Sequence, residues 1–473
     1  MNSAIGTGRL LAKPLLLAAT LALAMSHAFA AGEAKNVIFF LGDGMGPVTV
    51  TASRIFKYGE GGKLTMDTFG HTARIRTYSL DAQTTDSAPS MGAYMTGVKA
   101  RNEVLSMDGS TFAKPPSANT SVTPSVSAAV NNCPATGNGS PVPTLLEQAI
   151  AKGKASGVVT TARLTHATPA ATYAHICHRD AEYDISRQAV PGGAGFNAAL
   201  GSGIDVLLGG ISYFWRPFNA TGTPRGRPDG RDLVAELQAK GYTAVNDLAS
   251  LNTAPPTGRL IGLFDQAASQ GHMSYDLDRD PAKEPSLTQM TVKAIDILSK
   301  NPNGYFLMVE GGRIDHALHA TNAKRALADT IAFDDAIKAT LGKVDLSNTL
   351  VVVTADHDHT MAFNGYSHLG NDILGKTTDI KSRKPVMAAD GKPFTTLVFG
   401  NGLSARNSAR ADLTNVDTSG NKDYTQDVGV PLSSETHGGG DVMLFATGAG
   451  SNPFKGSLDN TKVYGLMRQA FGF

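Results

Sequence analysis

The hydrophobic positions of the chain form short continuous runs and do not alternate with polar positions. Six runs rich in β-branched residues lie at 36–42, 157–162, 205–210, 304–312, 349–356 and 395–400. Continuous hydrophobicity over such lengths is typical of strands that are covered on both faces. Segments with helical periodicity lie between the runs, at 143–152, 230–240, 286–300 and 322–342. The pattern predicts an α/β fold, a three-layer α/β/α sandwich with a mostly parallel central sheet.

Two stretches do not follow this pattern. Residues 109–141 are rich in Ser, Thr, Pro, Asn and Ala, which predicts a long surface loop or insert. Residues 364–433 mix Gly, Asn, Asp and Lys with a few strand signals, which predicts an insertion after the last strong strand. We therefore expect one large domain that carries two insertions.

The N-terminal residues have the pattern of an export signal. Arg9 and Lys13 form a basic region before an apolar run, PLLLAATLALAM, and Ala28-Phe29-Ala30 is a small-x-small cleavage motif. The apolar run is short for a membrane anchor, and no Cys follows it to carry a lipid. We expect a signal peptide at 1–30, cleaved after Ala30, and a mature chain of residues 31–473 without an anchor, in the periplasm or the medium.

Composition narrows the class of protein. The 473 residues are 41% hydrophobic and 18% charged, as in soluble globular proteins, and the net charge is +1. No basic tract indicates nucleic-acid binding. The two cysteines, Cys133 and Cys177, favour one disulfide in an exported protein, with two buried thiols as the alternative.

Three of the predicted strands end in a carboxylate. Asp43, Glu310 and Asp356 each stand at the end of a hydrophobic run. In open α/β sheets, ligands bind beyond the carboxyl ends of the strands. Each acid alone could cap a helix, but three acids at one edge would repel one another unless cations neutralise them.

Histidines accompany these acids. His357 follows Asp356 directly, and His437 lies in a Gly-flanked polar loop with no apolar pattern that would explain a core histidine. Asp315 and His319 are four residues apart, so on a helix they share one face and can bind one ion. Mixed carboxylate and imidazole ligands suit Zn²⁺, and all-oxygen ligands suit Mg²⁺. Such a site indicates metal-assisted displacement at phosphorus or sulfur.

The segment TTDSAPSMGAYMTG, residues 84–97, adds a candidate nucleophile. Asp or Ser before a Pro is a common helix start, so Ser87 could be only a cap. Beside metal ligands, however, a Ser hydroxyl is a competent nucleophile, and a helix N-terminus stabilises a phosphoryl group. The two interpretations are compatible.

Six motifs, in the same order along the chain, resemble those of alkaline phosphatases, and their sequences are closer to the animal-type branch than to the enterobacterial enzyme. They are NVIFFLGDGMG, TTDSAPSMGAYMTGVK, VVTTARLTHATPAATYAH, FLMVEGGRIDHALH, VVVTADHDH and ETHGGGDV, and they extend over about residues 35–470. The resemblance implies two zinc ions, one magnesium ion, a phosphoserine intermediate, phosphate monoester substrates and a homodimer. It also implies that the insertion at 364–433 corresponds to the crown subdomain of animal-type members.

The resemblance assigns a role to individual residues. Ser87 matches the nucleophile, and Arg179 matches the arginine that holds the phosphate. The implied metal ligands are Asp43, Asp356 and His357 for one zinc, Asp315, His319 and His437 for the other, and Glu310 and Thr168 with the bridging Asp43 for magnesium. The residues just outside these ligands would be Asp86, His166 and His316. Some members hold a further, peripheral calcium ion, and the candidate ligands for it are Phe264, Asp265 and Glu284.

The predicted function is therefore an exported, metal-dependent phosphomonoesterase. A sulfatase of the same superfamily would need an Arg that Ser87-Ala88-Pro89-Ser90-Met91 lacks. A phosphodiesterase usually has a Thr nucleophile and lacks the pair of Glu310 and Thr168. A non-catalytic phosphate-binding surface protein would tolerate the loss of Ser87 or a metal ligand, and all of them are present.

Overall fold

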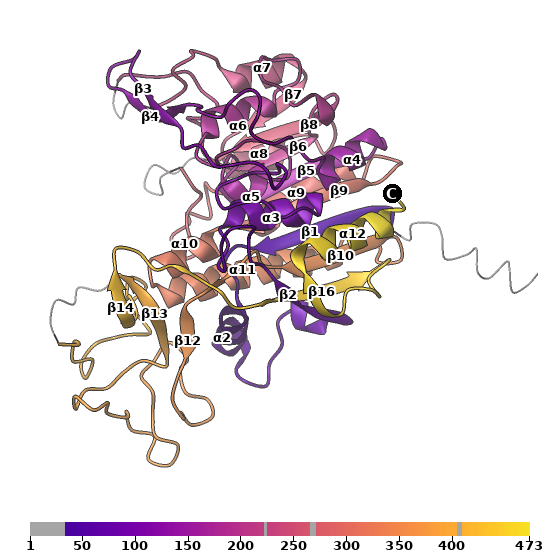
Figure 1. Ribbon diagram of the computed structural model, residues 1–473. Coiled ribbons are helices and arrows are strands. Elements are labelled where there is room, and N and C mark those ends of the chain that lie inside the picture. Colours follow the sequence, from indigo (N-terminus) through magenta and orange to yellow (C-terminus); the bar gives the residue numbers. More distant parts are fainter. Residues whose placement is uncertain (1–33, 222–224, 265–270, 404–408) are drawn as a thin grey trace, which may run out of the picture.

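A ten-stranded, mostly parallel sheet forms the centre of the molecule (Figure 1). The computed structural model describes residues 34–221, 225–264, 271–403 and 409–473, so the expected signal peptide lies outside the described part. In spatial order the strands are β17 (Gly456–Asp459), β2 (His71–Arg76), β16 (Val442–Gly448), β10 (Thr349–Thr354), β1 (Asn36–Gly42), β9 (Tyr305–Gly311), β5 (Ala155–Arg163), β6 (Val206–Gly210), β8 (Arg259–Leu263) and β7 (Tyr242–Val245). β16 runs antiparallel to both of its neighbours, and the other pairings are parallel.

Helices cover both faces of this sheet, which confirms the predicted α/β fold. One face carries α2 (Pro47–Tyr58), α9 (Leu287–Leu298) and α11 (Ala323–Leu341), and the other carries α3 (Ser87–Thr96), α4 (Leu145–Ala151) and α12 (Asn460–Phe471). The remaining helical elements are α5 (Ala167–Ala170), α6 (Glu182–Gln188), α7 (Leu233–Ala239), α8 (Leu248–Thr253), α10 (Arg313–His319), η1 (Met66–Thr68) and η2 (Ala198–Leu200). None of the described helices is both long and apolar enough to cross a bilayer.

The central strands are buried because helices lie on both sides of them. All of β9 and β10 and all but the first residue of β1 are buried, as their continuous hydrophobic runs predict. The helices that cover them begin at side-chain caps. Ser286 and Gln289 form a reciprocal capping box at α9, and Asn322 caps α11. These local signals agree with the predicted helices at 286–300 and 322–342.

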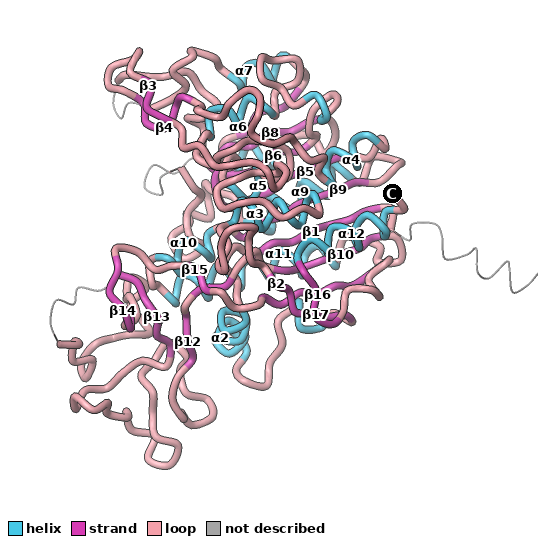
Figure 2. Tube along the Cα trace, in the orientation of Figure 1, coloured by secondary structure: helices cyan, strands magenta, loops and turns pink. Residues whose placement is uncertain are grey.

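The hydrophobic run at 395–400 differs from the other five. It becomes the start of β13 (Leu397–Leu403), which pairs with β12 (Met361–Phe363) and β14 (Val428–Leu432) in a separate three-stranded sheet. Buried and accessible residues intermingle along β13, so the expectation of a strand covered on both faces was wrong here. Figure 2 shows that long loops make up most of the remaining segment at 364–433.

The polar stretch at 109–141 is mostly loop, as expected, but it contains a short hairpin of β3 (Ser117–Asn119) and β4 (Val126–Val130). A disulfide joins Cys133, just after this hairpin, to Cys177, with 5.7 Å between the Cα atoms. The predicted disulfide is thus present, and free thiols are excluded because the chain has no other cysteine. The bridge attaches the loop to the segment that carries Arg179.

Candidate metal centre and nucleophile

The carboxylates of three strands meet at one edge of the sheet. β1 lies between β10 and β9, all three strands are parallel, and Leu41 is paired with both Thr354 and Glu310. Asp43 and Asp356 follow the ends of β1 and β10, so the parallel arrangement places them beside Glu310. All three acids are fully buried. The sheet therefore concentrates negative charge at a point from which water is largely excluded.

Asp43 is the centre of this group. Its Oδ1 lies 3.4 Å from both Ser87 Oγ and His357 Nε2, and its Oδ2 accepts a hydrogen bond of 3.2 Å from Thr168 Oγ1. Burial, together with the neighbouring carboxylates of Asp356 and Asp315, raises the pKa of Asp43 to about 7, although His357 lowers it. Burial and Asp43 likewise raise the pKa of Glu310 well above its usual value. A cation would relieve this repulsion.

Ser87 is held at the first turn of α3. Asp86 caps the helix by accepting a 2.7 Å hydrogen bond from Ala88 N, and Gly97 ends it in a left-handed conformation. The Ser87 side chain is buried, and its Oγ lies 3.2 Å from His357 Nε2. Burial lowers the pKa of His357, but Asp356 and Asp43 outweigh burial and raise it well above the usual value. The hydroxyl thus faces a strongly charged group of side chains at a helix start.

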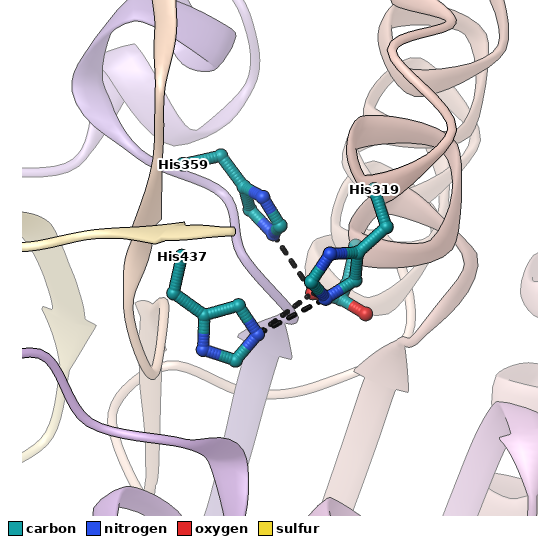
Figure 3. Close-up of side chains that lie close together, drawn as sticks. His319, His359 and His437 are labelled. Atoms are coloured by element: carbon teal, nitrogen blue, oxygen red, sulfur yellow. Dashed lines mark hydrogen bonds and ion pairs between the residues drawn. The ribbon is translucent and has the colours of Figure 1, made fainter. Parts of the chain in front are cut away.

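A second group surrounds Asp315 and consists of three histidines that point toward a common centre (Figure 3). Asp315 Oδ1 lies 3.3 Å from His319 Nε2, 2.8 Å from His359 Nε2 and 3.6 Å from His437 Nε2. Asp315 and His319 are one turn apart on α10. His359 and His437 are paired on β11 (Asp358–His359) and β15 (His437–Gly438), which form an antiparallel ladder. One carboxylate and three imidazoles offer the mixed donors that zinc prefers.

The charges of this second group differ from residue to residue. Burial raises the pKa of Asp315, but His319 and His359 outweigh that effect and hold it well below the usual value. Burial lowers the pKa of His359, but hydrogen bonds to Asp315 and Glu435 raise it to about 9. Burial and His357 lower the pKa of His437 well below its usual range, so its ring is neutral and able to bind a metal.

A third group of possible ligands comprises Asp43, Glu310 and His166. Thr160 Oγ1 donates to Glu310 Oε2, while Glu310 Oε1 and His166 Nδ1 are buried without a hydrogen-bond partner in the described structure. Unpaired buried polar atoms are rare because they cost free energy. The donor set and these two atoms fit a bound cation, and the oxygen atoms of Asp43, Glu310 and Thr168 suit magnesium.

Arg179 lies at the N-terminal end of α3, between Asp86 and His166. Its Nη1 lies 3.3 Å from Asp86 Oδ1 and its Nη2 lies 3.0 Å from His166 Nε2. The backbone also fixes it, because Arg179 N donates to Glu103 O at 2.8 Å and Glu103 N donates to Asp86. A guanidinium that is fixed in this way beside a Ser hydroxyl can receive a phosphoryl group with two parallel donors.

A sequence model of the family "Alkaline phosphatase" matches residues 34–473. The chain belongs to the alkaline phosphatase family. It is 40% identical to an alkaline phosphatase of Gadus morhua over 449 residues, which cover 88% of this chain and 87% of that protein. The protein is therefore an enzyme of this family, and the family supports phosphomonoesterase activity.

Solved alkaline phosphatase structures have the same fold. The enzyme of Thermus thermophilus is similar with a TM-score of 0.66 and 24% identity, over 98% of this chain and 96% of that one. A variant of the enzyme from the Antarctic bacterium TAB5, described with Mg bound in its M3 site, has a TM-score of 0.63 and 21% identity, over 94% and 99% of the two chains.

The structure of this alkaline phosphatase brings most of the sequence-selected residues into one connected centre. They are Ser87, Arg179, Asp43, Asp356, His357, Asp315, His319, His437, Glu310, Thr168, Asp86, His166 and His316. The calcium candidates stay a prediction. Phe264 is buried, Glu284 Oε1 accepts from Ser274 N at 2.7 Å, and Asp265 lies outside the described residues.

The sequence interpretation missed two histidines of the centre. His359 contacts Asp315, and its position two residues after His357 in TADHDHT was the available signal. The His272 ring lies against His316, with ring centroids 4.1 Å apart and ring planes tilted by 54°. It also lies beside Arg163, whose guanidinium makes a bidentate pair with Glu182. No local pattern distinguishes His272, because only the tertiary structure brings it to the site.

Proposed function

We propose that this member of the alkaline phosphatase family hydrolyses phosphate monoesters through a phosphoserine at Ser87. The observation that carries the proposal is the position of Ser87 Oγ, 3.4 Å from Asp43 Oδ1 and 3.2 Å from His357 Nε2, at a helix start close to Arg179. This arrangement joins a nucleophile, charged groups and an anion-binding side chain, which phosphoryl transfer requires.

We assign the three groups of ligands to three ions. Asp43, Asp356 and His357 would hold one Zn²⁺, and Asp315, His319 and His437 would hold another. Asp43, Glu310 and Thr168 would hold Mg²⁺, and magnesium in the TAB5 variant supports this assignment. When bound, such ions neutralise the carboxylates, lower the pKa of an attacking hydroxyl and stabilise developing charge on phosphoryl oxygens.

The residues of the chain position the substrate for two successive displacements. Arg179, oriented by Asp86 and His166, holds two non-bridging oxygens of the phosphoryl group. Ser87 Oγ forms a bond to phosphorus while the bond from phosphorus to the ester oxygen breaks, and the hydroxyl proton ends on the departing alcohol. Water then displaces Ser87 from phosphorus, which releases inorganic phosphate and restores the hydroxyl. Two inversions give retention at phosphorus.

The variant Ser87→Ala tests the nucleophile. We expect kcat on p-nitrophenyl phosphate to fall by at least about a thousandfold with an unchanged circular dichroism spectrum. The matched control is Ser347→Ala at an exposed serine outside the site. Mass spectrometry of acid-quenched wild-type enzyme should find phosphate on the peptide that contains Ser87. Activity of Ser87→Ala within about tenfold of wild type would refute the assignment.

Two further measurements test the substrate class and the ions. We expect p-nitrophenyl phosphate to be a much better substrate than bis-p-nitrophenyl phosphate or p-nitrophenyl sulfate, and the reverse order would favour a phosphodiesterase or a sulfatase. Dialysis against a chelator should remove activity, and Zn²⁺ together with Mg²⁺ should restore it. Metal analysis of the purified protein should find about two zinc ions and one magnesium ion.

We further propose that the chain is exported and that the mature enzyme is a homodimer. Support for export comes from the pattern at 1–30, which ends at Ala30, and support for the dimer comes from the family. The segment at 364–433, with β13 and β14, would form the crown of this enzyme. N-terminal sequencing of the secreted or periplasmic protein and its mass by light scattering test these two proposals.

A further inference from the structure

A shallow, open groove lies against the loop that precedes the nucleophile in the chain, with Gly439 on its other side. It has a volume of about 730 Å³ and is lined by residues 78–84 and by Gly439. Ser87 follows this loop by three residues, and His437 precedes Gly439 by two. His437 Nδ1 is 2.8 Å from the carbonyl oxygen of Thr85, so the two walls of the groove are joined at the catalytic centre.

Two large apolar side chains of the groove are exposed. Tyr78 is 48% exposed and Leu80 is 46% exposed. Single exposed apolar residues are common on protein surfaces and need no explanation. These two are distinctive because they are two positions apart in a loop that leads directly to the nucleophile.

Hydrogen bonds and one ring contact hold the loop that carries these side chains. Leu80 N donates to Ala100 O at 2.9 Å, and Asp81 Oδ1 accepts from Asn102 N at 2.9 Å. Lys99 Nζ donates to the carbonyl oxygen of Tyr78 and lies 3.9 Å from the centroid of its ring. Fixed contacts of this kind lower the entropy cost of binding.

The position of the groove fits the departing alcohol of the substrate. In an in-line displacement the leaving group departs opposite the attacking oxygen. Ser87 attacks from the side of Asp43 and His357, so the alcohol leaves toward the group of Asp315 and His437. Gly439, in the loop that follows His437, lines the groove, so the groove adjoins the side toward which the alcohol leaves.

We propose that this groove binds the alcohol part of the substrate and that Tyr78 and Leu80 select monoesters of uncharged alcohols with an aromatic or apolar body. The proposal rests on the proposed phosphomonoesterase function and names the substrate class that this site prefers. The carboxylate of Asp81 lies in the same wall and disfavours alcohols that carry further negative charge.

The test compares kcat/KM for 2-phenylethyl phosphate with kcat/KM for ethyl phosphate, two esters whose leaving groups have similar basicity. We expect the ratio to exceed one in the wild-type holoenzyme. Tyr78→Ala and Leu80→Ala should each reduce it about three- to tenfold, because an apolar contact to the larger alcohol is lost. Leu80→Met, which keeps an apolar side chain, should retain most of the preference.

Two more variants make the test specific. Gly439→Val changes the opposite wall of the groove, where even a Cβ atom would lie 3.2 Å from Thr84 Oγ1. The added side chain should narrow the groove and so lower the ratio of the two kcat/KM values. Ile380→Ala is the control, because Ile380 is 63% exposed and does not line the groove. Its ratio should equal that of wild type.

The outcomes distinguish the two proposals. If the wild-type enzyme hydrolyses both esters but Tyr78→Ala and Leu80→Ala leave the ratio unchanged, the groove proposal is wrong and the proposed function stands. If the wild-type enzyme hydrolyses neither ester, the proposed function fails and the groove proposal fails with it. Turnover of ethyl phosphate by each variant shows that its active site is assembled.

Discussion

Asp86 has two separable tasks, and two substitutions should separate them. One task is structural, because its Oδ1 accepts the hydrogen bond from Ala88 N that caps α3. The other is electrostatic, because the same oxygen lies 3.3 Å from Arg179 Nη1. Asp86→Asn keeps a good helix cap but removes the charge, whereas Asp86→Ala removes both. The two variants therefore differ in stability but share the loss of the charge.

The structure gives the expected magnitudes. The Asp86 and Arg179 side chains are only 12% and 17% exposed, so solvent screens their pairing weakly. A hydrogen bond to a charged group contributes about 1.5–3 kcal/mol, which corresponds to roughly 10- to 100-fold in kcat/KM. Loss of the cap should cost Asp86→Ala about 1 kcal/mol of unfolding free energy more than Asp86→Asn.

The assay combines kinetics with unfolding. We expect kcat/KM for p-nitrophenyl phosphate to fall and the inhibition constant for inorganic phosphate to rise in both variants, since each loses the orientation of Arg179. Urea unfolding measures how much the cap of α3 contributes to the unfolding free energy. The control is Asp247→Ala, which removes the cap of α8, where Asp247 Oδ1 accepts from Ser250 N at 2.7 Å, outside the site. It should lose stability without a kinetic effect.

Wild-type affinity for inorganic phosphate in Asp86→Asn would refute the role of Asp86 in orienting Arg179. Equal stability of Asp86→Asn and Asp86→Ala would refute its role as a cap. The two readouts are independent, so each result concerns one of the two contacts only.

Three other perturbations follow from the structure. His359→Gln should weaken zinc binding about 10- to 100-fold, because His359 orients the Asp315 carboxylate. Competition with a chromophoric chelator measures the affinity, and an unchanged affinity would contradict this role. Burial raises the pKa of Asp329 to about 8, so native Asp329 holds a proton that the unfolded chain releases above about pH 4. The stability of the wild-type protein therefore falls as the pH rises toward 8. Asp329→Asn should remove up to about 1.4 kcal/mol per pH unit of that fall in urea unfolding, and an identical pH profile would refute the shift. Joint replacement of Cys133 and Cys177 by Ser should cost about 2–4 kcal/mol of unfolding free energy, because the bridge spans 44 residues. Equal stability of the variant and the oxidised wild-type protein would contradict this.

The central sheet was predictable from the sequence because its strands are buried on both faces. The hydrophobic run at 36–42 coincides with β1, and the acids that follow such strands were found because a strand end is a local feature. The run at 395–400 has the same local composition, yet it forms β13 in a small sheet. Short hydrophobic runs do not encode which sheet they join, since that choice depends on distant partners.

Residues brought to the site by short or irregular elements were harder to predict. His359 belongs to β11, which has two residues and forms only when it pairs with β15, nearly eighty positions along the chain. His272 lies on no helix or strand. Propensity and periodicity need longer segments than these, so Arg179 was identified only by the motif resemblance, and no signal in the sequence identified His272.

The place of β16 in the sheet has a consequence for the order of assembly. This strand, residues Val442–Gly448, lies between β2 and β10 and follows both of them along the chain, so it leaves the ribosome after them. β2 therefore has no neighbour on the side of β10 until the C-terminal segment inserts between them, and β15, with His437, arrives only just before it. The last steps of folding and the completion of the catalytic centre thus coincide. Enzyme activity should serve as a late marker of folding, and chains shortened by their final forty residues should retain the fold of β1, β9 and β5 in part but no turnover.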